Sequence, residues 1–164
     1  MKFANGFWYS RPGVTPVHAH EVYDVETTPD TLTVYAPVRH VRGRSGTTNS
    51  PLLTVHYSSP MENVIRVDAV HHAGAPDRSP EFEVFADTAA SVKVEESDEH
   101  VRLSSGGLTV RVSTGSEWRV EFLADEHNGE RRLTMSPPEA FGYVDIDASQ
   151  VRPEAAASAM ARLN

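Results

Sequence analysis

Two histidines one position apart, His18 and His20, are the residues near the start of the chain whose type and spacing most suggest chemistry. Side chains alternate along a β-strand, so a His-x-His pair on a strand presents both imidazoles to the same face. Asp24 follows four residues after the second histidine. Imidazole and carboxylate groups are common metal ligands, and these three residues together could hold a metal ion.

With Gly13, these residues approach the first cupin signature, in which a glycine, a His-x-His pair and an acidic residue supply metal ligands. The spacing from Gly13 to His18 is one residue short, the acid is aspartate where glutamate is usual, and no second signature (Pro-x-Gly, then His) occurs in order. The adjacent His71 and His72 would point to opposite faces of a strand and could not bind one ion together. We interpret the histidines as surface or loop residues, with a cupin-like metalloprotein as the lesser alternative. We expect no metal and no cofactor.

Two carboxylates in the segment YVDIDAS, Asp145 and Asp147, would share one face of an extended chain and could run acid–base chemistry. Such residues more often mark the end of a strand than a catalytic pair. The acidic run EESDEH, residues 95–100, fits a solvated hairpin turn. No Gly-x-Ser-x-Gly elbow, P-loop or glycine-rich dinucleotide fingerprint occurs. We therefore assign no catalytic, cofactor-binding or metal-binding residue.

Four aromatic residues, Phe7, Trp8, Tyr9 and Trp118, could stack on sugar rings. Aromatic residues in a β-sandwich are more often buried in its core, where they contribute a large apolar area. A free-standing carbohydrate-binding β-sandwich, with Trp8, Tyr9 or Trp118 as stacking platforms, therefore stays an alternative function.

Alternating apolar and polar residues dominate the elements that must position these groups. Turn-forming residues separate the later segments, among them Ser105–Gly106–Gly107 and Asn128–Gly129, and Asn-Gly is a strong hairpin signal. Short strands at this spacing predict an all-β fold, an antiparallel β-sandwich. Residues 43–51 and 73–80 have the composition of long polar loops, and residues 153–164 that of a helix start after Pro153. The predicted strands are residues 31–38, 52–59, 63–72, 91–97, 100–105, 108–113, 117–125 and 131–136.

Length and charge restrict the function further. The chain has 164 residues, which fits one domain, and it has no cysteine, which excludes disulfides and thiolate chemistry. Its formal net charge of −8 argues against nucleic-acid binding. The arginine-rich segment 38–46 is short and is interpreted as a solvated loop. No apolar run reaches the length of a membrane span or fits a signal peptide, so we expect a soluble cytoplasmic protein without membrane contact.

Several stretches in order resemble the N-terminal domain of bacterial α-xylosidases of glycoside hydrolase family 31. The resemblance covers residues 3–150 and rests most on Gly6–Phe7–Trp8 followed by Arg11–Pro12–Gly13, on NSPLLTVHYSSPMENVIRV, and on Gly142–Tyr143–Val144. It implies a galactose-mutarotase-like sandwich over residues 1–150 and, in residues 151–164, a linker toward a (β/α)8 catalytic barrel.

The same resemblance implies a parent enzyme that hydrolyses α-xylosides with retention, through an aspartate nucleophile and an aspartate acid–base that both lie in the barrel. No catalytic residue of the family maps onto this chain, so we expect the chain alone to be inactive. The expected partners are the barrel of the same polypeptide and a carbohydrate near the domain loops, and homo-oligomers are possible. We expect residues 131–146 to reach toward the barrel, and an apolar docking face to be exposed.

Overall fold

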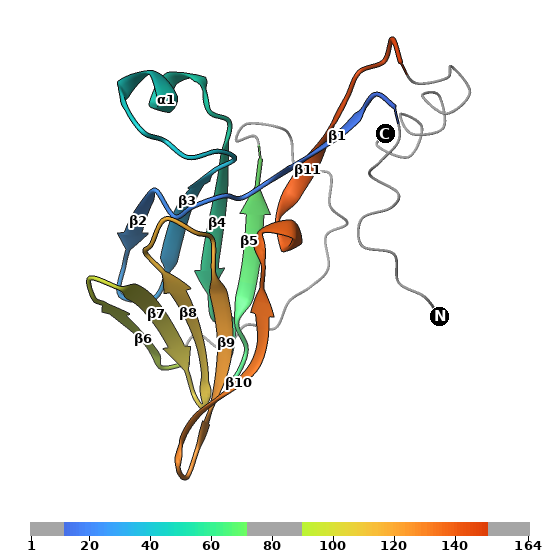
Figure 1. The fold of residues 1–164 in the computed structure, drawn as a ribbon. Coiled ribbons are helices and arrows are strands. Elements are labelled where there is room, and N and C mark those ends of the chain that lie inside the picture. The colour runs from blue at the N-terminus through green and yellow to red at the C-terminus, as the bar shows by residue number, and fades with distance from the viewer. Residues whose placement is uncertain (1–11, 72–89, 151–164) are drawn as a thin grey trace, which may run out of the picture. The chain divides into compact units, whose positions relative to one another are not determined.

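The computed structural model of the protein describes residues 12–71 and 90–150. These residues form eleven strands in three sheets, one short α-helix and one 3-10 turn, so the predicted all-β class is confirmed (Figure 1). The part of the chain that is described contains no helix long and apolar enough to cross a membrane.

Two antiparallel sheets make up the sandwich formed within residues 18–141. The four-stranded sheet has the order β2-β3-β4-β5, with β2 (Asp24–Thr27), β3 (Leu32–Pro37), β4 (Leu52–Ser58) and β5 (Arg66–Val70). The five-stranded sheet is a meander in the order β10-β9-β8-β7-β6. Its strands are β6 (Val92–Glu96), β7 (His100–Ser105), β8 (Leu108–Ser113), β9 (Val120–Glu126) and β10 (Gly129–Ser136).

Alternation explains the core. On β3 the even-numbered residues Leu32, Val34 and Ala36 are fully buried, while Thr33 and Tyr35 between them are half-exposed. Val101 on β7 and Val112 on β8 are paired across the strands and are also fully buried. Burying one such aliphatic side chain stabilises the fold by about 1.5–3 kcal/mol, so the period-two pattern fixes which face of each strand is internal.

Two local predictions were wrong, the start of one strand and the absence of a helix from one loop. The strand expected from Asn63 begins only at Arg66, because Asn63 has φ 62°, a left-handed conformation that cannot continue a strand. The loop expected over residues 43–51 contains α1 (Arg44–Asn49), which buries none of its residues. Hydroxyl groups stabilise this turn locally, since Thr47 Oγ1 donates to the Arg44 carbonyl at 2.7 Å. Hydrophobic periodicity cannot detect such a helix.

The third sheet pairs β1 (Val14–His18) with β11 (Gly142–Ile146). Asp147 N–H donates to the Gly13 carbonyl at 2.8 Å, which places the start of β1 beside the end of β11. Sequence patterns did not predict this pairing, because it joins segments from opposite ends of the chain. The proposed helix start at 153–164 and the loop at 73–80 lie outside the described residues.

Candidate functional site

The histidine pair lies at the end of β1 and in the segment that follows it. His18 is the last residue of the strand, whereas His20 lies beyond it with its backbone N–H donating to the Pro37 carbonyl at 3.0 Å. Asp24 begins β2, and its Oδ1 accepts the Val25 N–H at 2.9 Å. In residues 12–71 and 90–150, no group of three or more His, Asp or Glu side chains is arranged to hold a metal ion. The structure therefore does not bring the trio together as a metal site.

His20 instead contacts another histidine. Its ring centroid lies 4.1 Å from that of His40, and His40 Nδ1 donates to Glu21 Oε2 at 2.7 Å. Glu21 Oε1 also accepts the Val41 N–H at 2.8 Å. Burial raises the pKa of the Glu21 carboxyl, but the bonds from Val41 and His40 outweigh it and the net shift is downward. This cluster ties the β1–β2 connection to the segment after β3.

Asp145 and Asp147 occupy the end of β11 and the turn after it, and both are exposed. Asp147 closes that turn: its Oδ1 accepts the Ser149 N–H at 3.0 Å and the Ser149 hydroxyl at 2.6 Å. Gln150 Nε2 donates to Asp147 Oδ2 at 2.6 Å. These bonds lower the pKa of Asp147, as a turn-forming carboxylate requires.

The aromatic candidates divide between the core and the undescribed segments. Trp118 is 3% exposed and its ring meets that of Phe141 edge-on, with centroids 5.6 Å apart. It therefore presents no open face to a sugar. Phe7, Trp8 and Tyr9 lie outside the described residues, and so does His72, while His71 directly follows β5.

The outer face of the five-stranded sheet carries a charge cluster that sequence reasoning missed. Glu121 on β9 is 4% exposed and is shared by three guanidinium groups. Arg111, its cross-strand partner on β8, donates through Nη2 at 2.6 Å. Arg119 and Arg132 donate to the other carboxylate oxygen at 2.7 and 3.0 Å. Hydrogen bonds from Arg119 and Arg111, joined by Arg132, lower the pKa of Glu121 to about 2 although burial raises it.

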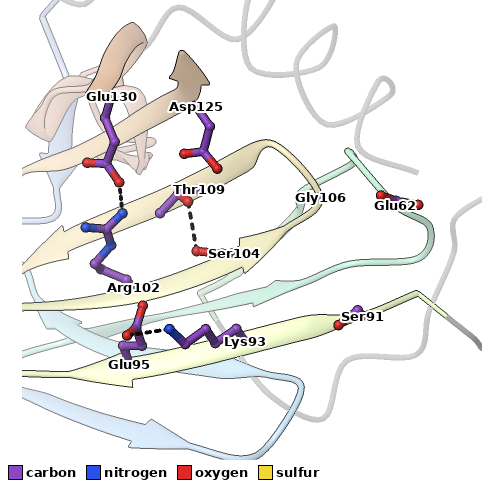
Figure 2. A pocket seen from close by; sticks show the side chains of 10 residues that line it. All are labelled: Glu62, Ser91, Lys93, Glu95, Arg102, Ser104, Gly106, Thr109, Asp125 and Glu130. Carbon is purple, nitrogen blue, oxygen red and sulfur yellow. Dashed lines mark hydrogen bonds and ion pairs between the residues drawn. The ribbon is translucent and has the colours of Figure 1, made fainter. Parts of the chain in front are cut away.

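Beside this cluster the same face is hollowed, over a volume of about 450 Å³ (Figure 2). Ion pairs form part of the rim: Arg102 on β7 pairs with Glu130 on β10, and Lys93 Nζ lies 2.8 Å from Glu95 Oε1 on β6. The residues that line the hollow, all charged or polar except Gly106, are Glu62, Ser91, Lys93, Glu95, Arg102, Ser104, Gly106, Thr109, Asp125 and Glu130.

The alternation in the segments 91–97, 100–105 and 108–113 could have indicated this face, because their non-core positions carry the charges and hydroxyls. Arg111 and Glu121 carry opposite charges and lie opposite each other, but this pairing can be predicted only when the register of β8 and β9 is known. Glu62 comes from the connection between β4 and β5, so no local pattern could place it at the hollow.

Comparison with known proteins finds similarity to two α-xylosidases. It is 30% identical over 125 residues to α-xylosidase XylQ of Lactiplantibacillus pentosus, a match that covers 76% of this chain and 16% of the relative. It is 27% identical over 147 residues to an α-xylosidase of Emericella nidulans, covering 88% of this chain and 19% of that protein. The chain thus spans less than a fifth of the length of these curated relatives. No protein-family model matches.

Among solved structures, the chain is similar to the uncharacterized protein lmo2446 of Listeria monocytogenes EGD-e. The TM-score is 0.54 at 16% sequence identity, and the match covers 80% of this chain and 11% of that one. At this identity the likeness concerns the fold alone.

Proposed function

We propose that this α-xylosidase-related domain is the non-catalytic β-sandwich of a retaining glycoside hydrolase of family 31 that acts on α-xylosides. The observation that carries the proposal is the coverage of the relatives. Up to 88% of this chain matches α-xylosidases, yet it accounts for at most 19% of their length. The remaining length of those proteins is ample for a separate catalytic domain, the (β/α)8 barrel that the resemblance implies, joined through residues 151–164.

Four carboxylates with lowered pKa values agree with a non-catalytic role. A retaining glycosidase needs two carboxyl groups about 5–5.5 Å apart, one of them with a raised pKa so that it can serve as the acid. Glu21, Glu95, Glu121 and Asp147 all have pKa values shifted downward by ion pairs or hydrogen bonds. These four groups are therefore held ionised and engaged, which suits structure rather than proton donation.

The proposed role of the domain is to support the barrel and to shape access to its active site, with a galactose-mutarotase-like sandwich as the scaffold. Residues 131–146 are the proposed contact region. They include most of β10, the 3-10 turn Pro138–Ala140 and all of β11. Leu133 and Met135 on β10 are 45% and 44% exposed, so this region offers apolar side chains for docking.

Hydrolysis of p-nitrophenyl α-xyloside tests the proposal. We expect no release of p-nitrophenol by this chain alone, and turnover by the longest polypeptide that its gene encodes. The Asp145→Asn/Asp147→Asn chain is the matched control for trace activity. Turnover by the unaltered chain that this double substitution removes would overturn the proposal.

A further inference from the structure

The hollow on the outer face of the five-stranded sheet is created by a contrast in side-chain size. Small residues, Ser104 and Thr109, occupy its middle, where an exposed sheet face ordinarily carries long solvated side chains, and Gly106 lies in the turn that joins their two strands. Long charged side chains surround them. Thr109 is only 3% exposed although it lines the hollow, so the floor lies well below the rim.

The floor consists of hydroxyl groups with unused bonding capacity. Ser104 Oγ and Thr109 Oγ1 are cross-strand neighbours joined by one hydrogen bond of 2.8 Å. A hydroxyl has one donor hydrogen and two acceptor lone pairs, so this pair keeps one hydrogen and several lone pairs for a ligand. A floor with donors and acceptors together suits a ligand that also carries both.

The two ends of the hollow differ in whether their charged side chains form ion pairs (Figure 2). At one end the Arg102–Glu130 and Lys93–Glu95 pairs fix the cations against carboxylates. Glu62 lies at the other end, where its loop is fastened because Asn63 Oδ1 accepts the Gly107 N–H at 2.7 Å.

Two carboxylates of the rim are open to a ligand. Among the described residues, the Glu62 and Asp125 side chains have no ion-pair or hydrogen-bond partner, so both keep their acceptor oxygens available. Carboxylate oxygens accept hydrogen bonds readily from hydroxyl groups, and a bond to an ionised acceptor is stronger than one between neutral groups.

These features select the class of ligand. An anion is disfavoured, because among the described residues four rim carboxylates outnumber two cations that are already paired. A metal ion is disfavoured, because within the described part of the chain no three carboxylate or histidine side chains converge. A volume of about 450 Å³ falls within the range of small-molecule sites, about 300–1,000 Å³. We propose that the hollow binds a neutral polyhydroxylated ligand, a short saccharide, with Asp125 and Glu62 accepting its hydroxyls and the Ser104–Thr109 pair contacting it from below.

This site is separate from the aromatic platforms considered from sequence, and it is independent of the proposed non-catalytic role. Among the described residues, no aromatic side chain lines the hollow. Affinity therefore rests on hydrogen bonds, which must replace bonds to water, so we expect a dissociation constant of about 1–10 mM.

Titration of the labelled chain with xylose and with a xylose-bearing xyloglucan oligosaccharide, followed by two-dimensional ¹H–¹⁵N NMR, tests the proposal. We expect saturable shifts of the Gly106, Gly107 and Lys93 amides. Asp125→Asn should weaken binding about tenfold, since it replaces an ionised acceptor by a neutral amide. Asp145→Asn, an exposed carboxylate on β11, is the matched control and should bind as the unaltered chain does.

A second variant, Ser104→Tyr, fills the hollow and should abolish the shifts. Each variant is first compared with the unaltered chain in urea unfolding, and Glu62→Gln replaces any variant that fails to fold. The proposal is overturned if no amide shifts at about 50 mM sugar, if Asp125→Asn and Ser104→Tyr bind unchanged, or if calcium or spermidine shifts the same amides and the sugars do not. Sugar binding at the hollow does not depend on hydrolysis, so either result leaves the proposed function untouched.

Discussion

On the outer face of the five-stranded sheet, the carboxylate of Glu121 accepts hydrogen bonds from three arginine side chains. It is 4% exposed, yet it stays ionised because three arginines donate to it. Burying a charge is costly unless it is paired and hydrogen-bonded, and here both oxygens are satisfied. The Arg111 side chain is 32% exposed and those of Arg119 and Arg132 are 53% exposed, so their charges remain partly solvated.

Replacing Glu121 by glutamine should destabilise the fold by about 1–3 kcal/mol at pH 7, because three charge-assisted hydrogen bonds lose their ionised acceptor. Urea unfolding measures the difference. Glu126→Gln is the control, since Glu126 pairs with Arg131 where both side chains are more than half exposed, and it should leave the midpoint unchanged.

The difference in stability between the unaltered chain and Glu121→Gln should depend on pH, and the lowered pKa of Glu121 gives that dependence its sign. Folding lowers the Glu121 pKa from its usual 4.5 to about 2, so the ionised carboxylate contributes its full stabilisation above about pH 4.5. The contribution falls as the pH drops toward 2. The unfolding midpoints of the unaltered chain and of Glu121→Gln should therefore converge between pH 4.5 and 2, and a gap that stays constant over this window would contradict the assignment.

The turn between β7 and β8 shows how one element fastens another. Gly106 has φ 56°, a left-handed conformation that glycine adopts without strain. A Cβ atom at this position would collide with the side-chain amide of Asn63, whose Oδ1 holds the Gly107 N–H. Position 106 thus needs glycine for two reasons: its left-handed backbone conformation and the close approach of the β4–β5 connection.

Gly106→Ala should lower the free energy of unfolding by about 1–3 kcal/mol, the range for a non-glycine residue forced into such a conformation against contacts. Thermal and urea unfolding measure it. Gly115→Ala is the matched control in another turn of the same sheet, where an added Cβ has no neighbour within 4 Å. Equal stability of the two variants would show that the Asn63 contact imposes no constraint.

For the whole molecule, the open side of β10 is the feature with the clearest consequence. Among the described strands, β10 is an edge of its sheet, and it exposes Leu133 and Met135. Unpaired edges with apolar side chains favour association with another chain.

We predict that the isolated chain self-associates through this edge, as detected by sedimentation velocity over a range of concentrations. The double substitution Leu133→Lys/Met135→Lys should weaken association at least about tenfold, because charged edge residues oppose strand pairing. Leu52→Lys, which alters an apolar residue 39% exposed on β4, should have no such effect. A monomer at all concentrations, or equal association of the three chains, would contradict the prediction.

The sequence by itself determined the fold class, most strands and which residues enter the core, because period-two alternation and turn residues such as Asn128–Gly129 are local signals. It also indicated that Trp118 could be buried and that Asp145 and Asp147 mark a strand end, and the structure confirms both. The likeness to α-xylosidases could be read from ordered stretches alone, and the comparisons confirm it.

Only the tertiary structure decided which side chains meet. The three arginines reach Glu121 because the register sets Arg111 opposite it and brings Arg132 across from β10. The hollow exists because small residues of β7 and β8 align while Glu62 arrives from a connection in the other sheet. Register and the closing of long loops depend on interactions between segments distant in sequence, and a local pattern carries no information about those interactions.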